Sequence, residues 1–168
     1  MNATFRKAHL NDLLPIWKIL QEGILRRKAD GSQQWQDGYP NVSVVENDID
    51  KGYGFVLEID EKIAGYCAIL INDEPAYDAI EGKWLSEGNF VVYHRVGVSE
   101  DFLGQGIAIK MLQEIENFAL QHNIFSLKVD TNFDNPAMMG LFEKLGYQYC
   151  GEVYFRGSAR RAYEKLLQ

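Results

Sequence analysis

The sequence predicts a mixed α/β fold, with a central, mostly antiparallel sheet of about seven strands and helices on both faces. Three observations predict this class. Strand and helix patterns intermix along the chain. Tight turns between apolar runs indicate antiparallel hairpins. A strand pattern at residues 90–98 leads through a helix to another strand at 124–130, which predicts one right-handed parallel β-α-β unit.

Composition places the chain among ordinary globular proteins. Its 168 residues are 46% apolar and 24% charged, which predicts a single domain over residues 1–168. The net charge of −7 argues against a nucleic-acid partner, because phosphate binding needs a cationic face. No window reaches the roughly 18 apolar residues of a membrane span, and the start lacks a signal-peptide core. Cys67 and Cys150 show no metal or redox spacing, so we expect reduced thiols, no metal and a cytoplasmic location.

The first elements are a strand at residues 4–8 and a helix that ends near Lys28. Asn11 is the expected cap of this helix, and Pro15 falls in or next to its first turn, where a missing N–H costs least. Apolar residues recur at helical spacing, and they are Leu13, Ile16, Leu20 and Ile24.

A polar loop at residues 29–41 precedes a second, shorter helix, for which Asn41 or Ser43 is the expected cap. Strands at 54–60 and 62–71 then form a hairpin. A long polar loop follows and leads to the strand at 90–98.

The C-terminal part begins with a strongly amphipathic helix pattern after residue 106. Its apolar stripe consists of Ala108, Met111, Leu112, Ile115, Phe118 and Ala119. The next helix has Asn135 as its cap, Pro136 at its first position and Gly146 as its stop. The last two strands, expected to pair antiparallel, are 147–155 and 160–167.

Two glycines stand where the helix after residue 106 is about to begin. Glycine weakens a helix start unless something must approach the backbone closely. A helix start also carries unpaired N–H groups and the positive end of the dipole, which attract anions. A diphosphate is therefore the natural guest of the backbone donors in the run Leu103, Gly104, Gln105, Gly106, Ile107 and Ala108.

Other glycine-rich phosphate loops fit less well. A Walker loop needs Gly-Lys-Ser or Gly-Lys-Thr, but Ala108, Ile109 and Lys110 stand there. A dinucleotide fingerprint needs a third glycine, which is absent, although Asp130 does end the next strand. From spacing alone, a turn without a ligand remains an alternative.

Two stretches resemble the motifs of one protein family. "VGVSEDFLGQGIAIKML", residues 96–112, resembles the acyl-CoA-binding motif of the GNAT N-acetyltransferase superfamily. "NPAMMGLFEKLGY", residues 135–147, is similar to that family's second motif. The element order also agrees, so the resemblance covers essentially the whole chain. It implies a single GNAT domain that transfers an acetyl group from acetyl-CoA to a primary amine in a ternary complex.

The resemblance also implies which residues bind acetyl-CoA. The N–H groups from Gly104 to Ala108 would hold the pyrophosphate, and the backbone of residues 96–98 would pair with the pantetheine arm like an added strand. Gly97 would mark a bulge that makes room for the thioester. The full expected set is Val96, Gly97, Val98, Leu103, Gly104, Gln105, Gly106, Ile107, Ala108, Asn135 and Phe142.

Three positions depart from the family pattern. Leu103 replaces the Arg or Gln that opens the glycine motif, so a side-chain contact to phosphate is lost. Phe142 stands where the family often has a tyrosine that protonates the leaving thiolate. The strand at residues 90–98 contains no Asp or Glu, so a carboxylate that some members carry is missing.

Acetyl transfer to an amine needs a base for the amine proton and donors for the oxyanion. His94 is the best candidate base, because strand alternation places it on the face of Val96 and Val98. The alternative is a packing role. Tyr93 would donate a proton to the thiolate if a bulge re-aims it, or else packs in the core. Glu100 would act through water, or else is a solvated loop residue.

Loop aromatics suggest the acceptor site. Trp35, Tyr39 and Trp84 lie in loops, and the loop that holds Trp84 is acidic. They predict a cationic or aromatic amine held by aromatic faces and carboxylates. The alternative is that these aromatics pin the loops to the domain.

Three functions stay open at this stage. The leading one is acetylation of a small-molecule amine. The second is acetylation of protein N-termini or lysines, and the third is a non-catalytic acyl-CoA sensor or partner-binding module. Exposed C-terminal strands are compatible with a homodimer.

Overall fold

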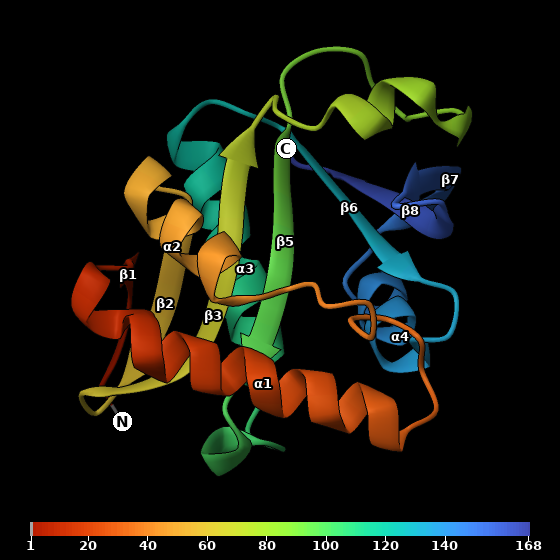
Figure 1. Ribbon diagram of the computed structural model, residues 1–168. Helices are drawn as coiled ribbons and strands as arrows, with labels where there is room; N and C mark the ends of the chain where they lie inside the picture. The colour runs from red at the N-terminus through yellow and green to blue at the C-terminus, as the bar shows by residue number, and fades with distance from the viewer. Residues whose placement is uncertain (1) are drawn as a thin grey trace. The chain divides into compact units, whose positions relative to one another are not determined.

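The structure is a computed structural model that describes residues 2–168 (Figure 1). Its strands are β1 (Ala3–Lys7), β2 (Gly54–Ile59), β3 (Lys62–Ile71), β4 (Glu81–Gly82), β5 (Val91–Val98), β6 (Ser126–Asn132), β7 (Gln148–Phe155) and β8 (Ser158–Leu166). Its helices are α1 (Leu13–Ala29), α2 (Val42–Lys51), α3 (Ile107–Gln121) and α4 (Pro136–Lys144), with short 3-10 turns at Leu10–Asp12, Pro75–Ala79 and Glu100–Phe102. The strands hydrogen-bond in the order β1-β2-β3-β5-β6-β8-β7-β4. The predicted mixed α/β class is confirmed.

Strand pairing is mostly antiparallel, as the hairpin signals predicted. β1–β2, β2–β3, β4–β7, β6–β8 and β7–β8 are all antiparallel pairs. β5 and β6 form the parallel pair, through Val91–Leu127 and Val92–Lys128. The helix between these two strands provides the crossover that a parallel connection requires.

One strand was not predicted. β4 has only two residues, and it pairs with β7 where Gly82 lies opposite Gly151. The two backbones approach so closely that a Cβ on Gly82 would lie 2.2 Å from the carbonyl oxygen of Cys150. A two-residue strand carries no apolar alternation, so only this glycine requirement marks it in the sequence.

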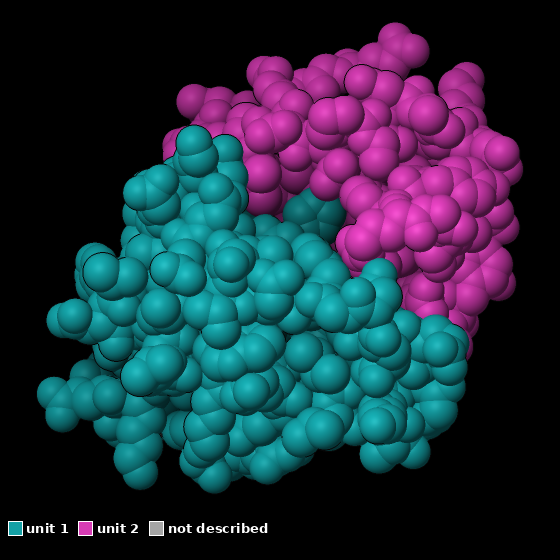
Figure 2. Space-filling model, in the orientation of Figure 1, with its two compact units in different colours: residues 1–69, 94–115 teal, residues 70–93, 116–168 magenta. Residues whose placement is uncertain are grey.

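The chain divides into two compact units, which Figure 2 colours separately. Unit 1 comprises Met1–Ile69 and His94–Ile115, and unit 2 comprises Leu70–Tyr93 and Glu116–Gln168. The division falls within β3, β5 and α3, so these three elements contribute residues to both units.

In unit 1, α1 and α2 cover one face of the strands, and α3 covers the other (Figure 1). Toward α1 and α2, the buried core consists of Ala8, Ile16, Leu20, Trp35, Val45, Val56 and Tyr66. Toward α3, it consists of Leu57, Ile59, Ala64, Ile107 and Met111. Along β2, the neighbouring residues Val56 and Leu57 thus lie on opposite faces of the sheet, as the pleat requires.

In unit 2, neighbouring residues of β8 also pack on opposite faces of the sheet. Ala162 packs in a cluster with Tyr77 of the turn Pro75–Ala79. Tyr163 packs against Phe142 of α4, with ring centroids 5.0 Å apart. Both faces of this part of the sheet are therefore covered.

The sequence predicted caps for three helices, and two of these predictions are confirmed. The Oδ1 of Asn41 accepts the Val44 N–H at 3.1 Å and begins α2, which decides between the two expected caps. The Oδ1 of Asn135 accepts the Met138 N–H at 3.3 Å and begins α4. Both side chains thus satisfy donors that a helix start leaves unpaired.

The expected cap of α1 at Asn11 is wrong. A 3-10 turn at Leu10–Asp12 precedes the helix, and the carboxylate of Asp12 accepts the His9 N–H at 2.7 Å. Asp12 also forms an ion pair at 2.9 Å with Arg6 of β1. The ion pair with Arg6 explains why Asp12, rather than Asn11, is fixed at the start of the helix. A contact with a different element of the fold leaves no local pattern in the sequence.

Candidate functional site

The glycine turn before α3 is open and conformationally demanding. Gly104 and Gly106 have φ angles of 75° and 74°, a region that side chains other than glycine rarely adopt. A Cβ at either position would meet nothing within 4 Å. The glycines are therefore required by backbone shape, and space remains above them for another molecule.

This turn presents backbone donors. The first bond of α3 runs from the Lys110 N–H to the Gly106 carbonyl, at 3.0 Å. None of the residues that the structure describes accepts a hydrogen bond from the N–H groups of Gly104 to Ala108. Together with the positive end of the α3 dipole, these N–H groups suit a phosphate anion. Leu103, at the start of the turn, is 47% exposed and adds no polar contact.

The residues before the turn belong to the end of β5. Val96 and Val98 pack toward α3, against the cluster that includes Ile107 and Met111. Gly97 faces α1, where a Cβ would lie 2.9 Å from Cγ2 of Ile19. Gly97 therefore allows close packing of α1.

The bulge expected at Gly97 stays a prediction. The positive φ within β5, 56°, belongs to Arg95, two residues earlier. The family resemblance implied a bulge at the glycine, a residue that adopts such angles without strain. The chain places an arginine at this positive φ and holds its side chain in a buried ion pair.

That ion pair joins α2 to β5. The Nε and Nη2 of Arg95 donate to the carboxylate of Asp48 at 2.9 and 2.7 Å. Tyr66 donates to the same carboxylate at 2.6 Å, and Nη1 of Arg95 contacts the hydroxyl of Tyr39. Asp48 is only 1% exposed. Burial, followed by the negative charge of Asp48, raises the pKa of Tyr66 far above its ordinary value, so this tyrosine stays protonated.

α1 also holds the end of β5. Nη2 of Arg26 donates to the Val98 carbonyl at 3.1 Å, and Glu22 accepts the Glu100 N–H at 3.1 Å. Neither side chain was expected at the site from the sequence. Their spacing of four residues, which puts them on one face of the helix, was the available signal.

The three candidate catalytic residues have different surroundings. His94 is half-buried in unit 1, the unit that contains the glycine turn. The side chain of Glu100 is 54% exposed and lies 3.7 Å from Nη1 of Arg26. Tyr93 is fully buried in unit 2, where its hydroxyl donates to the hydroxyl of Tyr147 at 2.8 Å. Burial raises the pKa of Tyr147, so this pair of tyrosines has the character of a packed core contact.

Asn135 and Phe142 lie in unit 2. The side-chain oxygen of Asn135 is used to cap α4. Phe142 is fully buried, with its ring centroid 5.3 Å from that of Tyr147 and 5.0 Å from that of Tyr163. Phe142 thus anchors α4 to the sheet.

The three loop aromatics are held differently. Trp35 is only 5% exposed and lies in the core of unit 1, with the guanidinium of Arg27 3.8 Å above its ring. Tyr39 contacts Arg95, as described above. Trp84 is half-buried in unit 2, and its Nε1 donates to the Tyr77 carbonyl at 3.0 Å. The burial of Trp35 is the arrangement expected for a side chain that pins its loop.

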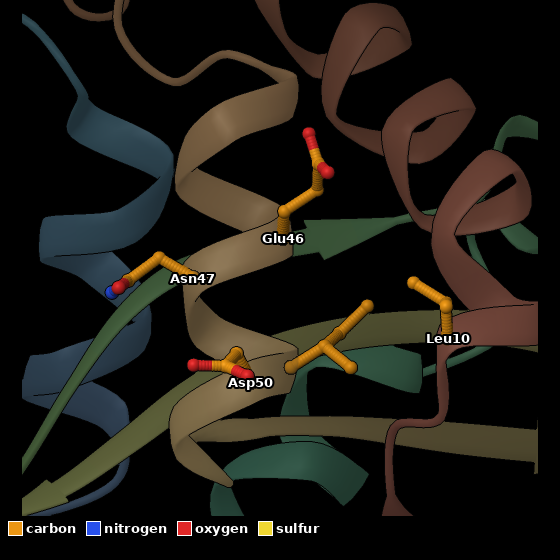
Figure 3. Close-up of a pocket in the computed structure, with 5 residues that line it drawn as sticks. Leu10, Glu46, Asn47 and Asp50 are labelled. Atoms are coloured by element: carbon orange, nitrogen blue, oxygen red, sulfur yellow. The ribbon is translucent and has the colours of Figure 1, made fainter.

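A separate hollow of about 430 Å³ opens on the surface of unit 1 (Figure 3). Its lining consists of Leu10, Glu46, Asn47, Ile49 and Asp50. None of the residues named above for catalysis or for cofactor binding lines it.

Three further features concern residues 2–168: possible metal ligands, the two cysteines and the lengths of the helices. No group of three or more His, Cys, Asp or Glu residues in this range could hold a metal ion. Cys67 and Cys150 are free and buried, and burial raises the pKa of both thiols. Within the same range, no helix is both long and apolar enough to cross a membrane.

Comparisons with known proteins agree on one family. The model of the acetyltransferase (GNAT) family matches residues 19–147. The uncharacterized N-acetyltransferase YesJ of Bacillus subtilis is 27% identical over 139 residues, which are 77% of this chain and 75% of YesJ.

Solved structures give the same result. A GNAT-family acetyltransferase from Streptococcus agalactiae is 36% identical and superposes with a TM-score of 0.91, over 99% of this chain and 96% of that one. YncA of Salmonella typhimurium, solved with its cofactor acetyl-CoA, is 18% identical and has a TM-score of 0.70, over 100% of this chain and 95% of that one. At that identity the second likeness shows a shared fold.

Proposed function

This chain belongs to the acetyltransferase (GNAT) family and is therefore an acyltransferase, and we propose that it acetylates the primary amine of a small molecule. The observation that supports this most directly is the open turn from Gly104 to Ala108. It offers a row of backbone donors to an anionic acyl carrier, and acetyl-CoA is the carrier that the family uses.

The pyrophosphate of acetyl-CoA fits this turn chemically. It needs several donors and a positive field, and the start of α3 supplies both without any side chain. The exposed Leu103 provides no charge, so the backbone must carry the contact alone. We therefore expect binding of the carrier to depend strongly on access to Gly104 and Gly106.

The acetyl end would lie along the end of β5. In the proposal, the pantetheine arm pairs with the backbone of residues 96–98, and an N–H near Val98 polarises the thioester carbonyl. Arg26 and Glu22 support this because they tie the end of the strand to α1. A strand end held by a helix loses little freedom when it binds its partner.

The reaction is a direct attack. The nitrogen of the neutral amine bonds to the carbonyl carbon, the carbon–sulfur bond breaks, and the thiolate of CoA leaves. The nitrogen loses a proton to His94, directly or through a water molecule that Glu100 orients. The thiolate takes a proton from solvent or from a nearby donor. A thiol has a pKa near 8.5, so no dedicated acid is needed, and the buried Tyr93 is dispensable for this step.

The acceptor would be a cationic amine. The aromatic side chain of Tyr39, in unit 1, favours a compact alkylammonium or aromatic amine, because an aromatic face attracts a cation. Trp35 contributes by shaping the loop that holds Tyr39, because its own ring is buried.

A non-catalytic acyl-CoA sensor is the second candidate. Two observations favour it: Phe142 is a buried anchor at the usual tyrosine position, and the hydroxyl of Tyr93 is engaged by Tyr147. A sensor needs the carrier site but neither a base nor an acceptor site.

One experiment separates these functions. Purified protein is supplied with acetyl-CoA and a panel of small primary amines, peptide N-termini and lysine peptides, and release of CoA is followed. We expect release with at least one small amine. Release only with peptides would replace the small-molecule acceptor by a protein. Tight binding in calorimetry without any release would establish the sensor.

A further inference from the structure

Arg95 combines two properties that no other described residue shares, since it lies inside a strand and has a positive φ without being a glycine. The other such residues lie in turns and loops, and they are Trp35, Asp60, Glu61, Asn72, Asn123 and Arg156. A strained residue persists only where its surroundings hold it, and such residues concentrate at functional sites.

Every nitrogen of the Arg95 guanidinium is held. The carboxylate of Asp48 accepts hydrogen bonds from Nε and Nη2 as a bidentate pair, and the hydroxyl of Tyr39 accepts one from Nη1. Asp48 is itself fixed by Tyr66, and both are buried. A planar fork held at three points can neither rotate nor slide, so the backbone that carries it is fixed as well.

The peptide groups that follow Arg95 are those on which the proposed function depends. Residues 96–98 begin immediately after the strained residue, and their side chains alternate regularly between the α3 face and the α1 face. The φ and ψ of Arg95 therefore set the direction of the N–H and carbonyl groups in this short segment.

We propose that Asp48 is a positioning residue for acetyl transfer, and this inference rests on the proposed function. Through Arg95, it holds the strained backbone conformation of β5 that aims the backbone of residues 96–98 at the acetyl thioester. Tyr39, on the proposed acceptor loop, binds the same guanidinium. Asp48 touches neither substrate and acts only through the geometry of the strand.

The chain contains a matched control. Arg6 and Asp12 form a second bidentate pair in unit 1, with distances of 2.9 and 3.1 Å, and Asp12 is 8% exposed. Arg6 has no positive φ, and β1 carries no proposed site residue. Asp12→Asn therefore breaks a similar ion pair without altering the backbone conformation at Arg95 in β5.

The test compares Asp48→Asn with Asp12→Asn. We expect Asp48→Asn to lower kcat about 100-fold, because small misplacements of reacting groups have effects of that size. Its affinity for acetyl-CoA in calorimetry should stay within about threefold, because the glycine turn is intact. Asp12→Asn should lower thermal stability and leave kcat unchanged. A normal kcat in folded Asp48→Asn would overturn the proposal.

A second variant covers the case in which Asp48→Asn does not fold. Asp48→Leu combined with Arg95→Met replaces the buried pair by apolar side chains, a change that proteins often tolerate. This double variant should bind acetyl-CoA and show the same loss of kcat. Wild-type turnover in it would equally overturn the role of Asp48.

A readout without an acceptor separates this inference from the proposed function. In wild-type protein, acetyl-CoA should shift the amide NMR resonances of Val96, Gly97 and Val98, and the double variant should lose this response. If the wild-type protein does not bind acetyl-CoA, the proposed function fails. If it binds and the double variant responds like the wild type, only the role of Asp48 fails.

Discussion

At Gly106, both the backbone conformation and the proposed ligand require a glycine. Its φ of 74° favours glycine, and the space beside it is open. We expect Gly106→Asp to abolish acetyl-CoA binding, because the new carboxylate would repel the pyrophosphate and cover the N–H groups. Isothermal calorimetry measures the loss.

Gly157 is the matched control for this substitution. It has the same φ of 74° and equally open surroundings, in the turn between β7 and β8. Gly157→Asp should cost about 1 kcal/mol of stability, as Gly106→Asp does, but leave binding intact. Unchanged affinity in Gly106→Asp would remove the glycine turn from the site.

His94 is the residue on which the proton transfer depends in the proposal. We expect His94→Ala to lower kcat about 100-fold while acetyl-CoA affinity changes little, because general-base catalysis contributes effects of that order. Turnover in His94→Ala close to that of the wild type would assign the base to another group.

At the scale of elements, α1 and β5 depend on the absence of one side chain. A methyl group at Gly97 would lie 2.9 Å from Ile19 and 3.2 Å from Leu20, both in α1. We expect Gly97→Ala to destabilise the protein by about 1–3 kcal/mol, because core helices yield little to overpacking. Urea denaturation measures this difference.

Gly140 provides the opposite case in α4. It is exposed and helical, and a Cβ there would meet nothing within 4 Å. Gly140→Ala should therefore stabilise the protein by about 0.5–1 kcal/mol. If Gly97→Ala and Gly140→Ala changed stability equally, close packing of α1 against Gly97 of β5 would be contradicted.

Some features of the helices and strands could be predicted from the local sequence alone. The turn of Asp60 and Glu61 has φ angles of 48° and 69°, as expected for a tight hairpin between apolar strands. The caps at Asn41 and Asn135 were recognisable because a cap acts within three residues of itself. β4 was missed because its partner lies far along the chain, in β7.

At the scale of the whole molecule, acid should weaken the fold partly through Asp12. Hydrogen bonds from Arg6 lower the pKa of this carboxyl below its ordinary value, although burial opposes the shift. A carboxyl with a lowered pKa in the folded state stabilises the protein above its unfolded pKa, near 3.9, and this contribution is lost as pH falls further.

The expected result concerns the difference between two proteins. At pH 7, Asp12→Asn should unfold with a free energy about 2 kcal/mol below that of the wild type. Below pH 4 the two values should converge, because the wild-type carboxyl becomes protonated as well. Denaturation curves across pH 2 to 7 measure this, and a difference that stays constant with pH would show that the ion pair is not the cause.

The sequence by itself determined the four helices, every strand except β4, two of the three expected caps, the glycine turn and the family, because these depend on contacts between residues near one another in the chain or on short motifs. The tertiary structure decided which side chains support the site. Asp48 of α2 reaches Arg95 of β5, Arg26 of α1 reaches Val98, and the positive φ within β5 belongs to Arg95. A strained conformation can be held by partners distant in the sequence, and only the folded chain brings those partners together.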